Sequence, residues 1–134
     1  MVEVIRKYPT GALATVKDGK PWVRHIGVST DDDLHLVAIS YVQSRKVDQI
    51  KKNRNVHIAF GLDPQNEKNP FINVEANAEV RTNAITRQQF WQDAFRGFFS
   101  GPDDPNYAVI KITPARIEYY GSYEQAPEVY LYQK

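Results

Sequence analysis

In the segment from Phe71 to Arg81, every second residue is apolar and polar residues stand between them. The apolar positions are Ile72, Val74, Ala76, Ala78 and Val80. Successive side chains of a β-strand point to opposite faces of a sheet. The pattern therefore predicts a strand over residues 71–81 with one buried face. The rest of the sequence predicts strands that can pair with it.

Tight turns divide the N-terminal part of the chain into three further strands. The dipeptide Asp18-Gly19 favours a two-residue hairpin, because both positions tolerate positive φ. Residues 31–33, all aspartate, form a second expected turn. Strands joined in succession by short turns predict an antiparallel meander. The expected strands of this meander cover residues 11–16, 21–30 and 34–40.

The second half of the chain supplies the remaining strands. Pro114 has no N–H to give to a ladder, so it marks an edge or a bulge in one long strand or between two short ones. The polar stretch that precedes Phe71 is expected to be a loop. The strands expected here cover residues 56–60, 107–112, 115–120 and, as a short last strand, 129–132.

Two short helices are expected in the first half of the chain. One covers residues 2–8 and ends before a proline, which disfavours helical backbone in the residue before it. The other follows Tyr41, where Val47 and Ile50 lie three residues apart on one face. Ser44 can cap its first turn, and an asparagine at position 53 or 55 can end it.

A third helix is expected after the strand over residues 71–81. Thr86 and Gln89 have the spacing of a capping box, in which each side chain satisfies a free backbone N–H of the other residue. The helix would start there, stop near Gly97 and carry the aromatic residues Phe90, Trp91 and Phe95.

These elements describe one domain over residues 1–134, with no internal repeat or linker. Six short strands with brief helices predict a mainly β fold, an antiparallel barrel whose ends are plugged by helices. The absence of cysteine excludes disulfides, thiol catalysis and thiolate metal sites. No apolar run approaches the ~18 residues of a membrane span, and a cytoplasmic location is expected.

Several function classes are disfavoured by charge and spacing. The 17 basic and 16 acidic side chains leave a net charge of +1, without the basic excess typical of nucleic-acid binding. His25, His35 and His57 fall on three different expected strands without ligand-like spacing, so no metal site is expected. Ser29 and Ser40 lack a nucleophile elbow, and no side chain stands out as a catalytic acid or base.

One corner of the expected fold suits an anion. Ser40 ends a strand, and Ser44, Arg45 and Lys46 begin the helix that follows it. Hydroxyls, free N–H groups at the first helical turn and two cations would meet there, and Arg24 would join them from the neighbouring strand. Cations at the positive end of a helix cost stability unless an anion neutralises them. The alternative is that these basic side chains only face water.

The order PWVRHIGVS, a strand, SRKVDQIKKN and then VHIAF resembles the FMN-binding pattern of the pyridoxamine 5′-phosphate oxidase family. The stretch IEYYG at residues 117–121 resembles another strand of that family, and FFSGPDDPNYAVIKI resembles its small general-stress-protein branch. The resemblance implies a six-stranded antiparallel Greek-key split β-barrel that binds FMN. It also implies a homodimer with the cofactor between the subunits.

The resemblance carries flavin-contacting roles onto residues of this chain. Arg24, Ser44, Arg45 and Lys46 match positions at the phosphate, and residues 25–28 match the strand that lies along the isoalloxazine. Tyr120 stands where the family has a flavin-contacting tryptophan. The residues expected to bind the cofactor are Arg24, His25, Ile26, Gly27, Val28, Ile39, Ser40, Ser44, Arg45, Lys46 and Tyr120.

The chain departs from the family on the substrate side. Ser29 stands at the position of the substrate-contacting lysine, and Phe71 at that of a glutamine that contacts FMN. The C-terminal arginine and histidine pattern has no counterpart in SYEQAPEVYLYQK. The expected function is therefore an FMN-dependent oxidoreductase, a reductase with NADH or NADPH as the candidate electron donor, and not an oxidase of pyridoxamine phosphate.

Three alternatives stay open at this level. The domain could hold flavin as a store or sensor without turnover, or a related barrel ligand such as deazaflavin F420 or haem. An OB-like barrel that binds nucleic acid would need exposed aromatics on a basic face. The aromatic residues near the third helix could cover a flavin in a partner subunit, but their helical spacing is more typical of core residues. They are Trp91, Phe95, Phe98 and Phe99.

Overall fold

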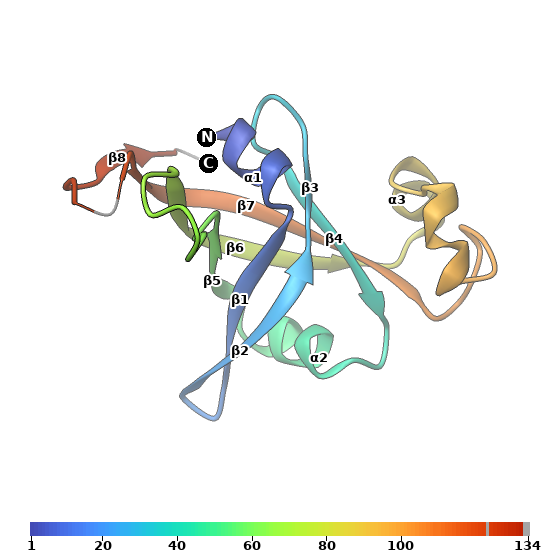
Figure 1. The fold of residues 1–134 in the computed structure, drawn as a ribbon. Helices are drawn as coiled ribbons and strands as arrows, with labels where there is room; N and C mark the ends of the chain where they lie inside the picture. Colours follow the sequence, from blue (N-terminus) through green and yellow to red (C-terminus); the bar gives the residue numbers. More distant parts are fainter. Residues whose placement is uncertain (123, 133–134) are drawn as a thin grey trace.

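The computed structural model describes residues 1–122 and 124–132, and its strands form one antiparallel sheet that curls on itself (Figure 1). The strands are β1 Thr10–Lys17, β2 Lys20–Gly27, β3 Ser29–Thr30, β4 Leu36–Tyr41, β5 Asn55–Phe60, β6 Phe71–Arg81, β7 Tyr107–Tyr120 and β8 Glu128–Leu131. The helices are α1 Val2–Lys7, α2 Arg45–Lys52, α3 Ala84–Gln89 and the 3₁₀ helix η1 Asp93–Gly97. None of the helices among these residues is long and apolar enough to cross a membrane.

The order of strands in the sheet makes it close on itself. The order is β2-β1-β5-β6-β7-β4-β3, with β8 paired to β7 outside this path. β2 and β3 stand at opposite ends of the order, yet only Val28 separates them along the chain. The two ends of the sheet are therefore held together covalently. This curled half-barrel confirms the expected mainly β split-barrel fold, with β3 formed from the end of the strand expected over residues 21–30 and β8 at the place of the expected short last strand.

Both turns of the meander expected at the N-terminus form, but its middle strand is broken. The β1–β2 hairpin is present, and Asp18 and Gly19 have φ values of 53° and 74°. The expected strand over residues 21–30, however, breaks at Val28, whose N–H donates to Pro9 O at 2.8 Å. β4 pairs with β3 and β7 and not with β2. The break lets one segment serve two sheet edges, which a continuous strand could not do.

The barrel core forms where the apolar faces of the strands meet the helices. Its fully buried side chains are mostly branched aliphatics: Leu13, Leu36, Val47, Ile50, Ile58, Ile72, Val74, Ile112 and Ile117. α2 contributes through the two residues predicted to share a face, and Ser44 caps it by accepting from Val47 N at 3.3 Å. Asn53 ends this helix, as one of the two expected positions.

β7 is one long strand with a bulge. Ala76 of β6 lies opposite Pro114, whereas the preceding Glu75 lies opposite Arg116, so Ala115 is an extra residue. The bulge stands next to the proline that predicted it. The bulge shifts the alternation of β7 by one residue. Ile112 before it and Ile117 after it therefore both face inward and pack in the barrel core.

The third helix is shorter and earlier than expected. Asn83, not Thr86, is its N-cap: Asn83 Oδ1 accepts the Thr86 N–H at 2.8 Å. α3 ends where the aromatic run begins, and η1 follows. The aromatic residues pack in a second, smaller cluster centred on Tyr107 and Phe99, in which Trp91 meets Tyr107 edge-on at 5.6 Å between ring centroids.

Replacing Asn83 with alanine should lower the free energy of unfolding by about 1 kcal/mol, because an N-cap acceptor is lost. Gln89→Ala, in the position that a capping box would have used, should change it by less than about 0.5 kcal/mol. Urea unfolding of both variants measures the difference. An equal cost at the two positions would contradict the assigned cap.

Candidate functional site

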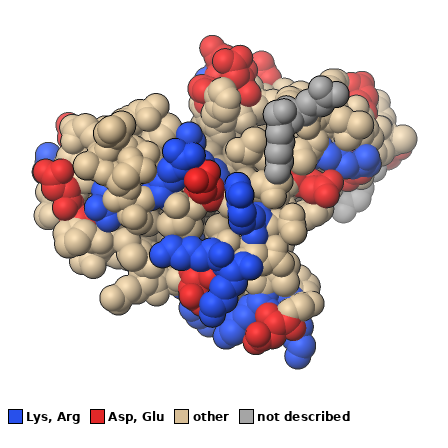
Figure 2. Space-filling view, turned by 180° about the vertical axis from the view of Figure 1, so that it is seen from behind, with Lys and Arg blue, Asp and Glu red and all other residues tan. Residues whose placement is uncertain are grey.

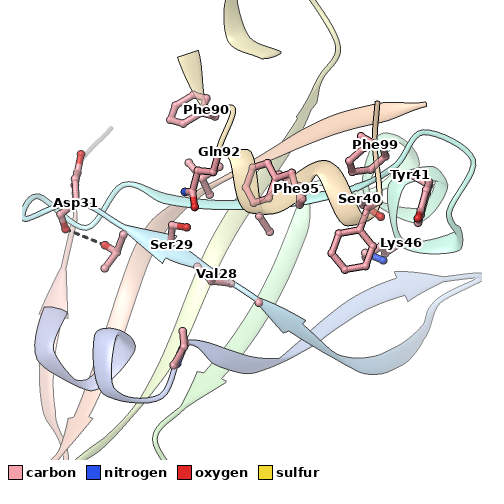
Figure 3. Close-up of a pocket in the computed structure, with 17 residues that line it drawn as sticks. Val28, Ser29, Asp31, Ser40, Tyr41, Lys46, Phe90, Gln92, Phe95 and Phe99 are labelled. Carbon is pink, nitrogen blue, oxygen red and sulfur yellow. Dashed lines mark hydrogen bonds between the residues drawn. The ribbon is translucent and has the colours of Figure 1, made fainter. Parts of the chain in front are cut away.

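A pocket of about 680 Å³ opens between the β2–β3 segment, β4 and the aromatic segment that follows α3 (Figure 3). Its volume falls within the roughly 300–1,000 Å³ of most ligand sites. Most of its wall is apolar, and Lys46 and Asp31 are its two charged lining residues among those that the structure describes. Figure 3 shows these two side chains at opposite ends of the pocket.

The Lys46 end of the pocket adjoins the start of α2. Ser40, the penultimate residue of β4, is buried and its hydroxyl donates to Ser44 Oγ at 2.9 Å. Ser44 Oγ in turn accepts the N–H of Val47. This chain of bonds fixes the strand-to-helix corner, so that the first helical turn and Lys46 keep a constant position beside the pocket.

Three cations, Arg24, Arg45 and Lys46, gather around this corner, and the carboxylate of the same helical turn, Asp48, is paired elsewhere. Burial, and then the charge of Arg45, lowers the pKa of Arg24. Burial, and then the charge of Arg24, lowers the pKa of Lys46 below its ordinary value of 10.5. Within residues 1–122 and 124–132, none of the three makes an ion pair; Asp48 of the same helix pairs with Lys52 at 3.3 Å. The mutual repulsion of these cations favours an anion between them.

A second pocket of about 320 Å³ lies on the other side of the first turn of α2 and is lined by Ser44, Arg45, Lys17 and Lys51, among others. The residues of the Ser-Arg-Lys motif are thus divided, with Lys46 facing the larger pocket. Figure 2 shows Lys and Arg side chains gathered on the lower half of one face. This is the end of the molecule where α2 and the β1–β2 hairpin lie in Figure 1.

Arg24 reaches α2 from β2, although β2 and β4 are not paired. Its Nη2 donates to Gln49 Oε1 at 2.9 Å and its Nη1 to Thr15 Oγ1 at 2.7 Å. Arg24 therefore contacts α2 at Gln49, in the middle of the helix, and it reaches the helix through the curl of the sheet and not through a meander. Arg24 lines neither pocket.

The structure brings some of the predicted site residues together and separates others. Those lining the larger pocket are Gly27, Val28, Ile39, Ser40 and Lys46. His25 is exposed on the outer face of β2, because alternate residues of a strand point to opposite faces, and Ile26 is buried in the barrel core. Tyr120 lies at the far end of β7, where its ring stacks on Phe71 at 4.6 Å between centroids.

The aromatic wall of the pocket is the part that sequence reasoning underestimated. Phe90, Phe95, Phe98 and Phe99 all line the pocket of their own chain, and Phe98 is 63% exposed at its edge. Trp91 does not line the pocket and packs against the second cluster, as Phe90 and Phe95 also do. Phe98 and Phe99, adjacent in a turn-rich loop, were the sequence feature that could have indicated this wall. Exposed loops seldom carry two large apolar side chains unless these contact something.

One group of metal-ligating side chains lies close together in the described part of the chain: Asp31, Asp33 and His35. All three are exposed, and Asp31 Oδ1 accepts the N–H groups of Asp33 and His35. His35 Nδ1 lies 2.6 Å from Asp31 Oδ2. These bonds close the β3–β4 turn, which accounts for the cluster without a ligand.

Comparisons with known proteins agree on one family. A family model described as pyridoxamine 5′-phosphate oxidase matches residues 1–121. General stress protein 26 of Bacillus subtilis is 28% identical over 127 residues, which cover 95% of this chain and 90% of that protein. The crystal structure of General Stress Protein 26 from Bacillus anthracis has a TM-score of 0.79 at 30% identity, covering 97% of this chain and 94% of that one.

A haem-binding protein from Mycobacterium smegmatis has the same fold, with a TM-score of 0.76 at 14% identity over 97% of this chain and 55% of that chain. At that identity the likeness concerns the fold alone. The family model, by contrast, spans nearly all of the sequence, and the curled sheet agrees with the solved structure from Bacillus anthracis. The chain therefore belongs to the pyridoxamine 5′-phosphate oxidase family.

Proposed function

We propose that this protein binds FMN and is an FMN-dependent reductase that does not oxidise pyridoxamine phosphate. The observation that carries the proposal is the group of three cations at the start of α2, Arg24, Arg45 and Lys46, which has no carboxylate partner in the described residues and adjoins an apolar pocket. FMN combines a flat, largely apolar ring system with a terminal phosphate. The pocket offers matching surroundings for each part.

The residues present fit the cofactor in chemistry as well as in size. Val28, Ile39 and the phenylalanines would enclose the ring and exclude water from it, and Lys46 would hold the phosphate. The bound flavin supplies the redox chemistry, and the protein supplies position and access. No side chain of the described pocket is assigned a proton-transfer role.

The far end of the pocket argues against a phosphorylated substrate. Ser29, Thr30 and Asp31 line that end, so its one charge is negative. A phosphate monoester placed beside Asp31 would be repelled, and Ser29 offers no cation to offset the repulsion. We therefore propose an uncharged or cationic electron acceptor for the reductase.

Haem and non-catalytic flavin binding are separable from this proposal by measurement. None of the described histidines lines the larger pocket, so it offers haem no imidazole ligand. A flavin store or sensor would use the same residues, and would differ because NADH and NADPH would leave its bound flavin oxidised under anaerobic conditions.

We also propose that two copies of the chain associate through the outer face of the sheet. Val23, Ala14 and His57 lie side by side across β2, β1 and β5, and Val23 is 66% exposed. A sheet face with exposed apolar side chains is suited to pack against a partner. His25, which is exposed on β2 away from the pocket of its own chain, would lie at this interface.

Lys46→Met should weaken FMN binding about 10- to 100-fold, because it removes a charge-assisted hydrogen bond to the phosphate. Riboflavin, which lacks the phosphate, should bind the variant as it binds the wild type. Fluorescence titration measures both affinities. Lys52→Met removes the same charge at the other end of α2 and should leave FMN binding unchanged. Equal FMN affinity of the wild type and Lys46→Met would reject the phosphate assignment.

The lowered pKa of Lys46 predicts that Lys46→Met stabilises the ligand-free protein. In the native state the charged form is disfavoured relative to the unfolded chain, so a protonated Lys46 costs stability below its lowered pKa. Thermal unfolding without ligand should give the variant a higher Tm at pH 7, with the gap narrowing as the pH approaches 10.5. Saturating FMN should reverse the order. A lower Tm of the ligand-free variant at pH 7 would contradict the argument.

Val23→Asp should shift the protein from dimer to monomer in light scattering coupled to size exclusion, because two carboxylates would be buried across the interface. Lys20→Asp, on the same strand beside the hairpin tip, serves as the control and should leave the dimer intact. A wild type that runs as a monomer would reject the proposed association.

A further inference from the structure

Two buried polar side chains lie between β1 and α2 in an otherwise apolar region. Thr15 is 0% exposed and Gln49 is 5% exposed, and the Thr15 hydroxyl donates to Gln49 Oε1. Burying such groups is costly unless they are hydrogen-bonded. The buried residues near them, Leu13 on β1 and Ile50 on α2, are aliphatic, so this polar pair differs from its surroundings. A further polar group bonded to the pair would explain its burial.

That partner is Arg24. Its Nη1 donates to Thr15 Oγ1 at 2.7 Å and to the backbone oxygens of Trp22 at 3.1 Å and Leu13 at 3.3 Å. Its Nη2 donates to Gln49 Oε1 at 2.9 Å. The Nη1 side of the guanidinium is thus anchored on the protein.

The opposite edge of the same group stays available. A guanidinium has five N–H donors, and Nε of Arg24 has no acceptor among the residues that the structure describes. Nε and Nη2 form the edge with which arginine binds a phosphate through two parallel hydrogen bonds. Anchoring one edge therefore presents the other in a fixed orientation.

A purely structural role explains the pair less well. Two buried polar groups that only joined β1 to α2 could be replaced by apolar groups of the same shape at nearly neutral cost. The hydrogen bonds of Thr15 and Gln49 hold Arg24 near Arg45 and Lys46. Without these bonds, repulsion by the other two cations would turn Arg24 toward solvent. The network is thus positioned to oppose the main electrostatic conflict of the site.

We propose that Gln49, together with Thr15, is a positioning residue that orients Arg24 toward the phosphate of the flavin. The inference rests on the proposed FMN binding and adds residues for which the sequence pattern had no role. It predicts that Gln49 acts on the discrimination between FMN and riboflavin and not on the affinity for the ring.

The test compares the affinities of the full-length protein for FMN and riboflavin. Gln49→Leu should reduce the FMN-to-riboflavin affinity ratio roughly 10-fold, with riboflavin binding unchanged, because Arg24 loses its anchor. Gln49→Glu should also reduce the ratio, because a carboxylate would neutralise Arg24. Thr15→Val should act like Gln49→Leu, and it remains informative if the latter fails to fold. Thr15→Ser keeps the hydroxyl and should preserve the ratio.

Ile50→Val provides the matched control in the same helix–strand contact. It removes a buried methylene group and should lower stability by about 1 kcal/mol without changing the ratio. An unchanged ratio in both Gln49→Leu and Thr15→Val, or an equal loss in Ile50→Val, would overturn the positioning role. A wild type that binds FMN no better than riboflavin would instead reject the phosphate site itself.

Discussion

The segment Lys20–Thr30 holds the molecule closed. It contains β2, which pairs with β1, and β3, which pairs with β4. β2 and β3 are the two ends of the strand order. Because the two pairings share one backbone, the sheet between them has to curl until its ends meet. The larger pocket opens where this segment changes partners, beside Val28 and Ser29, so the location of the site follows from the closure of the sheet.

The cationic corner is costly for the ligand-free protein. Burial lowers the pKa of Arg24 and of Lys46, and the charge of a neighbouring cation lowers it further, Arg45 acting on Arg24 and Arg24 acting on Lys46. The barrel core and the buried bonds of Thr15 and Gln49 hold these groups in place. An anion bound among these cations would reduce their mutual repulsion.

Local signals in the sequence predicted local structure well. The Asp18-Gly19 turn, the Ser44 cap and the strand over residues 71–81 each depend on a few neighbouring residues, and the structure contains all three. The pairing of β4 with β7 joins Leu36 to Ile112, and no local pattern specifies so distant a contact. The expectation that strands joined by short turns are neighbours placed β4 beside β2, and it was wrong at that position.

The same distinction applies to the site. Ser40 and Lys46 could be predicted because a strand leads directly into a helix start, where free N–H groups are expected. Gln49 was not singled out, because an amide on an amphipathic helix reads as part of a solvated face until the curl of the sheet covers it. The place of Phe98 in the pocket wall depends on how a loop folds back, which residue type alone does not determine.

The bulge at Ala115 has a consequence for how this chain can vary. Before it, the even-numbered residues of β7 face inward; after it, the odd-numbered Ile117 does, while Glu118 stays outside and pairs with Arg116. Loss of one residue here would exchange those two positions, moving a carboxylate into the barrel and an isoleucine out of it. The side chain at position 115 can therefore be substituted without altering which residues face inward. An insertion or deletion between Pro114 and Tyr120 would alter it, and would be selected against more strongly.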